Sequence, residues 1–269
     1  MAITALHAAA SGMRALDEKL NVVANNLANI NTHGFKRSRV NFEDLLYQVK
    51  REPGVRNADD EPIPHGILVG TGVKVSGTQL DFAQGAVDQT SKPLDWQIDG
   101  EGLFQVRTIV DGQEEIAYTR SGAFVENALG NIVLANSDGA VLEPPLTLPQ
   151  DTTGITVGRD GRVQVTQQGS STQTEIGQIE LARFVNPEGL KSIGRNLYLE
   201  TDASGEPLQG NPQEDGLGAI VQFSLEMSNV DPVRELIDLI TTQRAFEMNS
   251  QSIQSADESL QIVSNLRRF

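Results

Sequence analysis

Carboxylates and three histidines are the residues of this 269-residue chain that could do chemistry, because the sequence contains no cysteine. Disulfides, zinc–thiolate sites, iron–sulfur clusters and cysteine nucleophiles are thereby excluded. His7, His33 and His65 are scattered, and neither a His-Glu-x-x-His nor a Gly-x-Ser-x-Gly motif is present. The glycine pairs Gly70-Thr71-Gly72 and Gly100-Glu101-Gly102 complete no phosphate-binding or dinucleotide-binding fingerprint. We expect the histidines to be surface or packing residues.

The closest approach to a carboxylate cluster is Asp99, Glu101, Asp111 and Glu115, which would suit a two-carboxylate glycosidase. Asp99 and Asp111 each precede a glycine, however, and Asp in such a turn bonds its own backbone. No segment has the alternating Asp/Asn loop ending in Glu that binds calcium. We therefore predict no catalytic, cofactor-binding or metal-binding residue, no cofactor, and no enzymatic activity.

The net charge of −15, from 21 basic and 36 acidic side chains, argues against nucleic-acid binding, which requires a basic surface. No stretch approaches the roughly 20 apolar residues of a membrane span. The charge is uneven: residues 1–50 carry +2, residues 51–230 carry −15, and residues 231–269 carry −2. The chain thus has three parts.

Apolar residues at steps of three and four predict an amphipathic helix over residues 3–31. The stripe comprises Ile3, Leu6, Ala10, Met13, Leu16, Leu20, Val23, Leu27 and Ile30. Gly34 follows as the expected helix stop. Asn21, Asn25 and Asn29 share one face, with Asn26 and Asn31 close by. These amides suit either specific helix–helix hydrogen bonds or a solvated polar face.

A second long helix is predicted at the other end of the chain. Asp231-Pro232 is a strong helix start, because the carboxylate caps free amides and proline at the first position loses no hydrogen bond. Residues 233–269 contain neither Gly nor Pro. The large apolar residues Leu239, Phe246, Ile253 and Leu260 are spaced by seven, with Thr242, Asn249, Ala256 and Val263 as companions. This repeat favours a coiled-coil role, and the alternative is a helical hairpin packed on its own domain.

The residues between the helices have the composition of β-structure. Asp-Gly pairs at 99–100, 111–112, 138–139 and 160–161 predict hairpins. Strands are expected at 103–106, 113–119 and 162–165, in a sandwich-like or barrel-like all-β body. Residues 50–66, with three prolines and the acidic cluster Asp59-Asp60-Glu61, are expected to form an extended linker or surface loop. The predicted fold is therefore mixed α and β, with long terminal helices and an all-β central body.

Two long motifs resemble the signatures of the bacterial flagellar rod and hook proteins. Residues 24–36, Ala-Asn-Asn-Leu-Ala-Asn-Ile-Asn-Thr-His-Gly-Phe-Lys, are similar to the amino-terminal signature. Residues 228–231, 243–247 and 265–266 are similar to the carboxy-terminal one. The segments 47–73, 98–106, 118–120 and 178–198 resemble the distal-rod members of that family. Phe223 stands where the family usually shows glycine, and Pro232 where an apolar residue is more usual.

The resemblance implies a structural subunit that polymerises into the distal rod, the shaft that carries torque from motor to hook. It implies an inner coiled-coil domain from helices 1–35 and 228–269, an extended segment 36–75, and a β-rich domain 76–227. The assembly interface would include Leu20, Asn25, Asn26, Leu27, Asn29, Gly34, Phe35, Asn229, Asp231, Leu239, Gln243, Arg244, Phe246, Ile253 and Leu260.

The partners implied are further copies of the chain, the proximal rod proteins, the hook protein, the peptidoglycan and outer-membrane ring proteins, and the flagellar export apparatus. The location implied is the periplasm-spanning rod, reached by export without a cleaved signal peptide; residues 1–19 do not match a secretory signal. The alternatives are a hook or proximal rod subunit, or an acidic secreted carbohydrate-active β protein.

Overall fold

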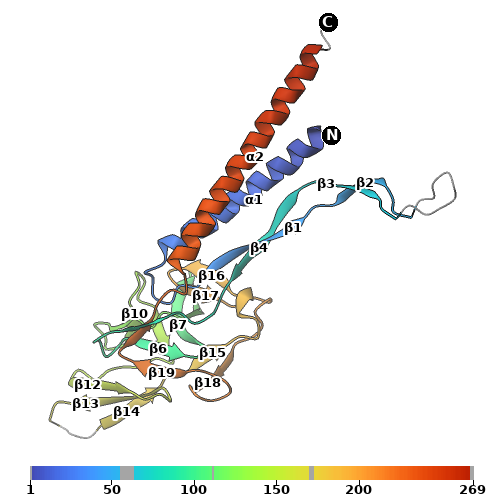
Figure 1. Ribbon diagram of the computed structural model, residues 1–269. Helices are drawn as coiled ribbons and strands as arrows, with labels where there is room; N and C mark the ends of the chain where they lie inside the picture. Colours follow the sequence, from blue (N-terminus) through green and yellow to red (C-terminus); the bar gives the residue numbers. More distant parts are fainter. Residues whose placement is uncertain (1, 55–63, 111, 170–172, 267–269) are drawn as a thin grey trace. The chain divides into compact units, whose positions relative to one another are not determined.

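A helix at each end and a long series of strands between them make up the chain (Figure 1). The computed structural model describes residues 2–54, 64–110, 112–169 and 173–266. These described residues divide into two compact units. Unit 1 comprises Met1–Ala28, Ser38–Gln79 and Asp231–Phe269, and unit 2 comprises Asn29–Arg37 and Leu80–Val230. The mixed α and β character that the sequence predicts is confirmed.

The elements follow one another in a simple order. The helices are α1 (Ala2–Ala28), the 3-10 helix η1 (Pro187–Gly189) and α2 (Pro232–Leu266). The strands are β1 (Ser38–Asp44), β2 (Tyr47–Arg51), β3 (Ile67–Gly70), β4 (Val73–Leu80), β5 (Val87–Gln89), β6 (Trp96–Asp99), β7 (Leu103–Val110), β8 (Gln113–Thr119), β9 (Phe124–Glu126), β10 (Ile132–Leu134), β11 (Val141–Glu143), β12 (Thr152–Val157), β13 (Arg162–Gln167), β14 (Gln173–Gln178), β15 (Leu181–Arg183), β16 (Lys191–Gly194), β17 (Leu197–Leu199), β18 (Leu208–Gly210), β19 (Ala219–Gln222) and β20 (Ser224–Glu226).

In unit 1, α1 and α2 lie side by side and run in opposite directions (Figure 1). Helix α1 ends at Ala28, three residues before the predicted end. Asn29 and Thr32 close a turn there: the Thr32 amide donates to the Asn29 carbonyl at 3.2 Å, and the Thr32 hydroxyl donates to the Asn29 side chain at 3.1 Å. Side chains of this kind compete with helical backbone bonding, so the helix stops before Gly34 is reached.

The start of α2 is the one that the sequence predicts. The Asp231 carboxylate accepts hydrogen bonds from the amides of Val233 at 3.0 Å and Arg234 at 3.3 Å. Pro232 occupies the first helical position, where a missing N–H costs nothing. The first turn of α2 is thus fixed by its own sequence.

The segment expected to be an extended linker contains regular strands. β1 pairs with β4, and β2 pairs with β3, so that unit 1 carries a two-stranded ribbon (Figure 1). The linker prediction for residues 50–66 is wrong at Lys50 and Arg51, which belong to β2. The acidic cluster Asp59-Asp60-Glu61 lies outside the described residues.

Unit 2 is built on antiparallel sheet, as expected for the central part of the chain. Its largest sheet has the order β16-β17-β8-β7-β11-β10-β9, with β15 joining β7 to β18. A second sheet, β12-β13-β14, and the pairs β19-β6 and β20-β5 complete the described strands of this unit. The strands predicted at 103–106, 113–119 and 162–165 correspond to β7, β8 and β13.

The hairpin between β7 and β8 lies between two hydrophobic clusters. Phe104, Val106 and Ala117 belong to the larger cluster, which also contains Trp96. The smaller cluster, on the other face of the hairpin, is formed by Leu103, Tyr118, Ala182, Phe184, Leu190 and Tyr198. Because successive side chains of a strand point to opposite faces, residues 103–106 of β7 and 117–119 of β8 are buried on both sides, whereas Ile109 and Ile116 nearer the turn are exposed.

The Asp-Gly pairs mark turns, and most of them close hairpins. Gly112, Gly139 and Gly161 have φ of 84°, 60° and 81°, between β7 and β8, β10 and β11, and β12 and β13 respectively. Asp111 lies outside the described residues. The hairpin expected at 99–100 is absent from the described pairings, because β6 pairs with β19 rather than with β7. Phe223 has a φ of 62°, a conformation that glycine adopts without strain.

Candidate assembly surfaces

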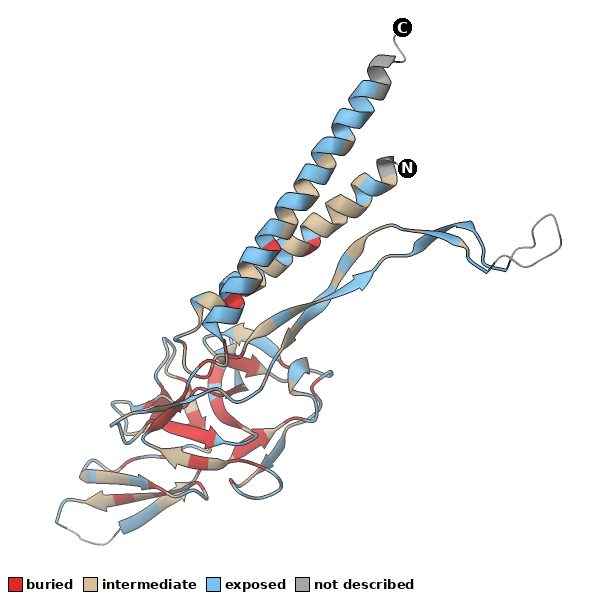
Figure 2. Cartoon of the chain, in the orientation of Figure 1, coloured by how far each residue is buried: buried red, intermediate tan, exposed pale blue. Residues whose placement is uncertain are grey.

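One face of α2 packs along α1 within unit 1 (Figure 2). The buried and half-buried residues of this face alternate at steps of four and three: Glu235, Leu239, Thr242, Phe246, Asn249, Ile253 and Ala256. Spacing of this kind is typical of the contact face between two long helices. Leu239, Phe246 and Ile253, from the predicted seven-residue series, therefore lie against α1 of the same chain, while Leu260 is 38% exposed. We call this face the seam.

On the α1 side, the two helices come close together at a glycine, Gly12. Ala15 and Val23 are buried. A Cβ atom at Gly12 would lie 3.5 Å from the Asn249 side chain, so that the two helices approach closely at this point. Leu20 and Leu27 of the predicted interface are half-buried.

Asn26 is the most buried asparagine of the row predicted on α1, with 1% of its surface exposed. Its amide nitrogen donates to the Ser38 carbonyl at 2.8 Å and to Glu235 Oε2 at 3.3 Å, and its Oδ1 accepts from the Ser38 amide at 3.0 Å. It therefore holds the start of β1 and the first turn of α2. Asn25 is exposed and Asn29 half-buried.

The opposite face of α2 is apolar and exposed. Val233, Ile237, Ile240 and Met248 are 62%, 54%, 47% and 62% exposed, and Arg244 lies among them. At 100° per residue these five positions cluster about 180° from the seam. We call them the outer face of α2. The predicted seven-residue series does not include the apolar residues of this face.

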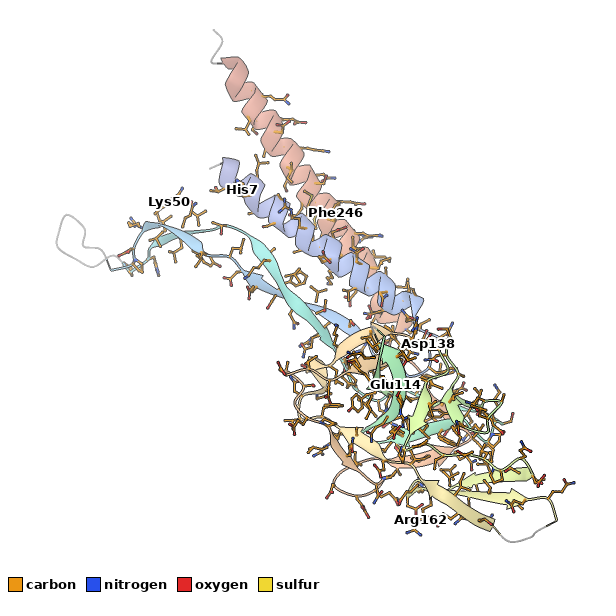
Figure 3. All side chains as sticks on the ribbon, turned by 180° about the vertical axis from the view of Figure 1, so that it is seen from behind. His7, Lys50, Glu114, Asp138, Arg162 and Phe246 are labelled. Atoms are coloured by element: carbon orange, nitrogen blue, oxygen red, sulfur yellow. The ribbon has the colours of Figure 1, made fainter. Side chains whose placement is uncertain are left out.

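The β1–β4 and β2–β3 ribbon, whose side chains are drawn as sticks in Figure 3, is also rich in exposed apolar side chains. The large exposed ones are Phe42, Leu46, Tyr47, Val49, Ile67 and Leu68. A ribbon of two strands cannot bury both of its faces by itself. Contiguous apolar surface of this kind usually marks a site of contact with another protein.

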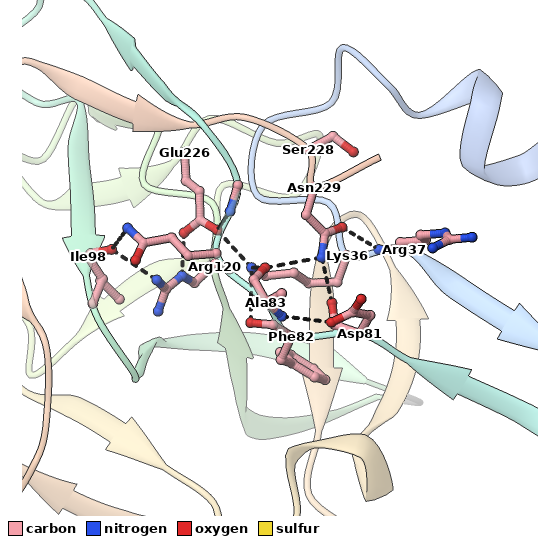
Figure 4. Close-up of polar contacts among 12 residues, drawn as sticks. Lys36, Arg37, Asp81, Phe82, Ala83, Ile98, Arg120, Glu226, Ser228 and Asn229 are labelled. Carbon is pink, nitrogen blue, oxygen red and sulfur yellow. Dashed lines mark hydrogen bonds and ion pairs between the residues drawn. The ribbon is translucent and has the colours of Figure 1, made fainter. Parts of the chain in front are cut away.

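Unit 2 contains a buried cluster of charges (Figure 4). The Glu226 carboxylate, with 1% of its side chain exposed, accepts from Lys36 Nζ at 2.7 Å and from Arg120 Nε. It also accepts from the Gly85 amide at 2.9 Å. Arg120 further donates to the carbonyls of Ile98 at 2.9 Å, Gly100 at 2.7 Å and Gly102 at 2.5 Å.

Burial and charge act in opposite directions on the Glu226 carboxyl. Burial alone would raise its pKa, but the charges of Arg120 and Lys36 and the Gly85 hydrogen bond outweigh burial, so the pKa is lowered. Burial lowers the pKa of Lys36, and the neighbouring Glu226 carboxylate opposes that effect. The cluster sequesters two cations and one anion, so a substitution that removes the anion leaves the two cations uncompensated.

Several predicted interface residues make contacts inside unit 2. Gly34 is buried with a φ of 72°, and a Cβ there would lie 2.5 Å from the Ser121 amide nitrogen. The Asn229 side chain accepts from the Arg37 amide at 2.7 Å and donates to the carbonyls of Asp81 at 2.8 Å and Ala83 at 3.1 Å. Phe35 is half-buried. In unit 1, Asp231, Gln243 and Arg244 are exposed.

A cavity of about 600 Å³ adjoins the charged cluster and is lined by Lys36, Phe82, Leu103, Arg120 and Phe184, among others. A second, of similar volume, is lined by Arg107, Asp138 and Arg195, among others, and Arg195 pairs with Asp138. Over the described residues, no group of three or more His, Cys, Asp or Glu is placed to hold a metal ion. None of the helices described is long and apolar enough to span a membrane.

Three family models match the chain in order. They are the flagella basal body rod protein model over residues 6–36, the flagellar hook protein FlgE/F/G D1 domain over 97–165, and the flagellar basal body rod FlgEFG protein C-terminal model over 221–266. The chain is 45% identical to the flagellar basal-body rod protein FlgG of Caulobacter vibrioides over 264 residues, covering 98% of this chain and 99% of that protein. The chain belongs to the flagellar basal-body rod protein family.

The identities to two flagellar proteins of one organism show which type of family member this chain resembles more. The chain is 35% identical to the flagellar basal-body rod protein FlgG of Bacillus subtilis, over 99% of this chain and 100% of that protein. It is 29% identical to the flagellar hook-basal body complex protein FlhP of the same organism, over 96% and 97%. Within this family, the chain is thus more similar to the FlgG type of rod protein. The rod proteins of this family are structural components of the flagellar rod.

Proposed function

We propose that the chain is a structural subunit that polymerises into the distal rod of the bacterial flagellum and carries torque from the motor to the hook. The observation that carries this proposal is the second apolar face of α2. A helix that is apolar on two opposite faces requires two partners. Helix α1 covers the seam, and the outer face, with Val233, Ile237, Ile240 and Met248, is exposed.

A further copy of the chain is the partner that fits the outer face. A contact between two different surfaces of identical subunits, when the rotation does not close, generates a helical filament. The exposed apolar side chains of the β1–β4 and β2–β3 ribbon supply a second contact surface. In this arrangement the helices 1–35 and 228–269 form an inner coiled-coil layer, the segment 36–75 links neighbouring subunits, and residues 76–227 form the outer body.

The proposed role is mechanical rather than catalytic. The partners are further copies of the chain, the proximal rod and hook proteins, the peptidoglycan and outer-membrane ring proteins, and the flagellar export apparatus. The subunit would cross the inner membrane through that apparatus without a cleaved signal peptide and act in the periplasm-spanning rod. Similarity to rod protein FlgG over the whole chain supports this reading over a hook or proximal rod subunit.

The test is a double substitution on the outer face, Ile237→Gln with Ile240→Gln. Glutamine keeps a helix propensity close to that of isoleucine, so the helix content of the free subunit should be unchanged by circular dichroism. Electron microscopy of the concentrated full chain should show filaments for the natural sequence and none for the variant. The same variant should fail to restore swimming to cells that lack their own rod protein.

The matched control is Ser252→Gln with Gln254→Asn, which changes two exposed positions of the same helix about 80° from the centre of the outer face. This control should form filaments as the natural chain does. Filaments from the Ile237 and Ile240 variant, equal in number to those of the control, would remove the outer face from the proposed interface.

A further inference from the structure

The charged cluster of unit 2 joins parts of the chain that are far apart in sequence. Lys36 and Glu226 are separated by 190 residues, and Arg120 comes from the middle of the chain. Through backbone partners the cluster also includes Ala83 and Gly85 and the carbonyls of Ile98, Gly100 and Gly102. Five segments of unit 2 therefore meet in this cluster (Figure 4).

The hydrogen-bonding capacity of the cluster is used within the protein itself. Lys36 Nζ donates to Glu226, to the Ala83 carbonyl at 2.7 Å and to the Phe82 carbonyl at 3.5 Å. Arg120 donates to Glu226 and to three carbonyls. An ammonium has three donors and a guanidinium has five, so little capacity remains for an anion in the adjoining cavity. The charged groups of the cluster therefore bind other parts of the same chain rather than a ligand.

The cluster lies where the first and last segments of unit 2 meet. The Gly34 amide donates to the Glu226 carbonyl at 2.8 Å. The Arg37 amide donates to the Asn229 side chain at 2.7 Å, and the Asn229 amide donates to the Phe35 carbonyl at 3.5 Å. Residues 34–37 follow α1 in the chain, and residues 226–229 precede α2.

We propose that Lys36, Arg120, Glu226 and Asn229 form a clasp that holds together the first and last segments of unit 2, residues 34–37 and 226–229, and that filament assembly depends on it. The clasp acts by position, because Lys36, Arg120 and Glu226 are at most 5% exposed and can touch no neighbouring subunit. It holds the chain that comes from one terminal helix beside the chain that leads to the other. The inference has two parts, the existence of the clasp and the need for it in filament assembly. Only the second part rests on the proposed function.

The test removes one cation while keeping its apolar stem. In Lys36→Met the Glu226–Arg120 pair remains, so the core of unit 2 has no reason to unfold. The second variant, Asn229→Ala, removes the side chain that bridges to the Arg37 amide and to the Asp81 and Ala83 carbonyls. The control, Arg107→Met, removes the cation of the exposed Arg107–Glu143 pair of the same unit.

Amide hydrogen exchange tests the clasp independently of assembly. In Lys36→Met the amides of Gly34 and Arg37 should exchange roughly ten- to a hundredfold faster, the effect of losing one charge-assisted hydrogen bond on a local opening. The amides of Leu134 and Leu148, which donate to carbonyls elsewhere in unit 2, should exchange at the natural rate. Acceleration of all four amides together, or of none, would overturn the clasp.

Electron microscopy of the full-length variants tests the assembly half. Lys36→Met and Asn229→Ala should form few or no filaments, and Arg107→Met should form them normally. Filaments in normal number from both clasp variants, with the amides of Gly34 and Arg37 accelerated, would show that assembly does not need the clasp. A natural chain that forms no filaments contradicts the proposed function and this half of the inference, while the exchange result still decides whether the clasp exists.

Discussion

At the scale of single residues, Gly34 shows why a position in the family signature accepts glycine. Its φ of 72° is unfavourable for residues with a Cβ, and the space that a Cβ would occupy is filled by the backbone of Arg120 and Ser121. The residue thus serves the close approach of two segments of unit 2. Its place in the signature reflects the fold of one subunit.

Gly34→Ala should lower the free energy of unfolding by about 2–4 kcal/mol, from the left-handed conformation and the overlap with Ser121 together. Gly139→Ala is the matched control, because Gly139 has a φ of 60° but no atom within 4 Å of an added Cβ. The control should lose only about 1–2 kcal/mol. Urea denaturation measures both values, and equal losses would show that crowding at Gly34 is unimportant.

Two buried tyrosines should make the protein sensitive to alkali. Burial, with help from Glu200, raises the pKa of Tyr118 to about 12, and burial, with help from Glu226, raises the pKa of Tyr198 to about 12. The ordinary pKa is 10.0, so between pH 10 and 12 the folded state holds these protons and the unfolded state releases them. Stability therefore falls as the pH rises through this range, by up to about 1.4 kcal/mol per pH unit for each tyrosine.

The measurement is the urea midpoint between pH 9 and pH 12, for the natural chain and for Tyr118→Phe with Tyr198→Phe. The double variant should show a clearly shallower decline above pH 10. A decline of the same slope in both proteins would assign the alkaline sensitivity to other groups.

At the scale of the elements, the helix pair of unit 1 depends on how closely α1 approaches α2. Gly12 faces Asn249, and a Cβ at Gly12 would make an ordinary van der Waals contact at 3.5 Å. Alanine therefore fits at this position, whereas longer side chains would meet the partner helix. Substitutions at Gly12 therefore report how far apart α1 and α2 lie.

Gly12→Ala should stabilise α1 by up to about 1 kcal/mol, because alanine has the higher helix propensity and finds room. Gly12→Leu should lower the helix content of the free subunit, because the larger side chain forces the helices apart. Thermal melting followed by circular dichroism at 222 nm compares the two variants. A loss of stability in Gly12→Ala would mean that the helices lie closer than this seam geometry allows.

The elements that follow from local sequence could be predicted, and those that depend on distant partners could not. The apolar stripe of α1, the Asp231-Pro232 start of α2 and the turn glycine Gly139 each depend on residues within a few positions. The Lys36–Glu226 pair spans 190 residues and the Asn26–Glu235 contact 209. No local pattern indicates such pairs, because nothing near either residue specifies its partner.

The same reasoning applies to the predicted interface residues of α2. Their seven-residue spacing indicates which side of the helix is covered. It does not report whether the covering helix belongs to the same chain or to another. Leu239 and Phe246 therefore pack against α1 of their own chain, and the outer face emerges only when exposure is known.

At the scale of the whole molecule, the acidic charge is concentrated between residues 51 and 230, which carry a net charge of −15. A charged surface of one sign stays solvated and repels others like it. In the proposed rod residues 76–227, which carry −14 of this charge, form the outer body that faces the surrounding rings, and their surface would limit adhesion to those rings.

Neutralising four exposed acidic residues of this region tests that role: Glu115→Gln, Glu126→Gln, Asp202→Asn and Glu206→Gln. Filament formation should be unaffected, because none of these positions lies in the helices or the ribbon, and swimming speed should fall. Unchanged swimming and unchanged ring assembly would remove the idea. Four exposed glutamines changed to asparagine elsewhere in the same unit serve as the control.

The meeting of residues 34–37 with residues 226–229 has a consequence for how such a protein can change in size. A body whose first and last segments are bonded to one another behaves as an insert. Strands can be added to or removed from its far parts while the two ends keep their separation. The terminal helices can then stay the same in related proteins. The β-rich body between them can be enlarged, reduced or exchanged to suit the proteins that surround it.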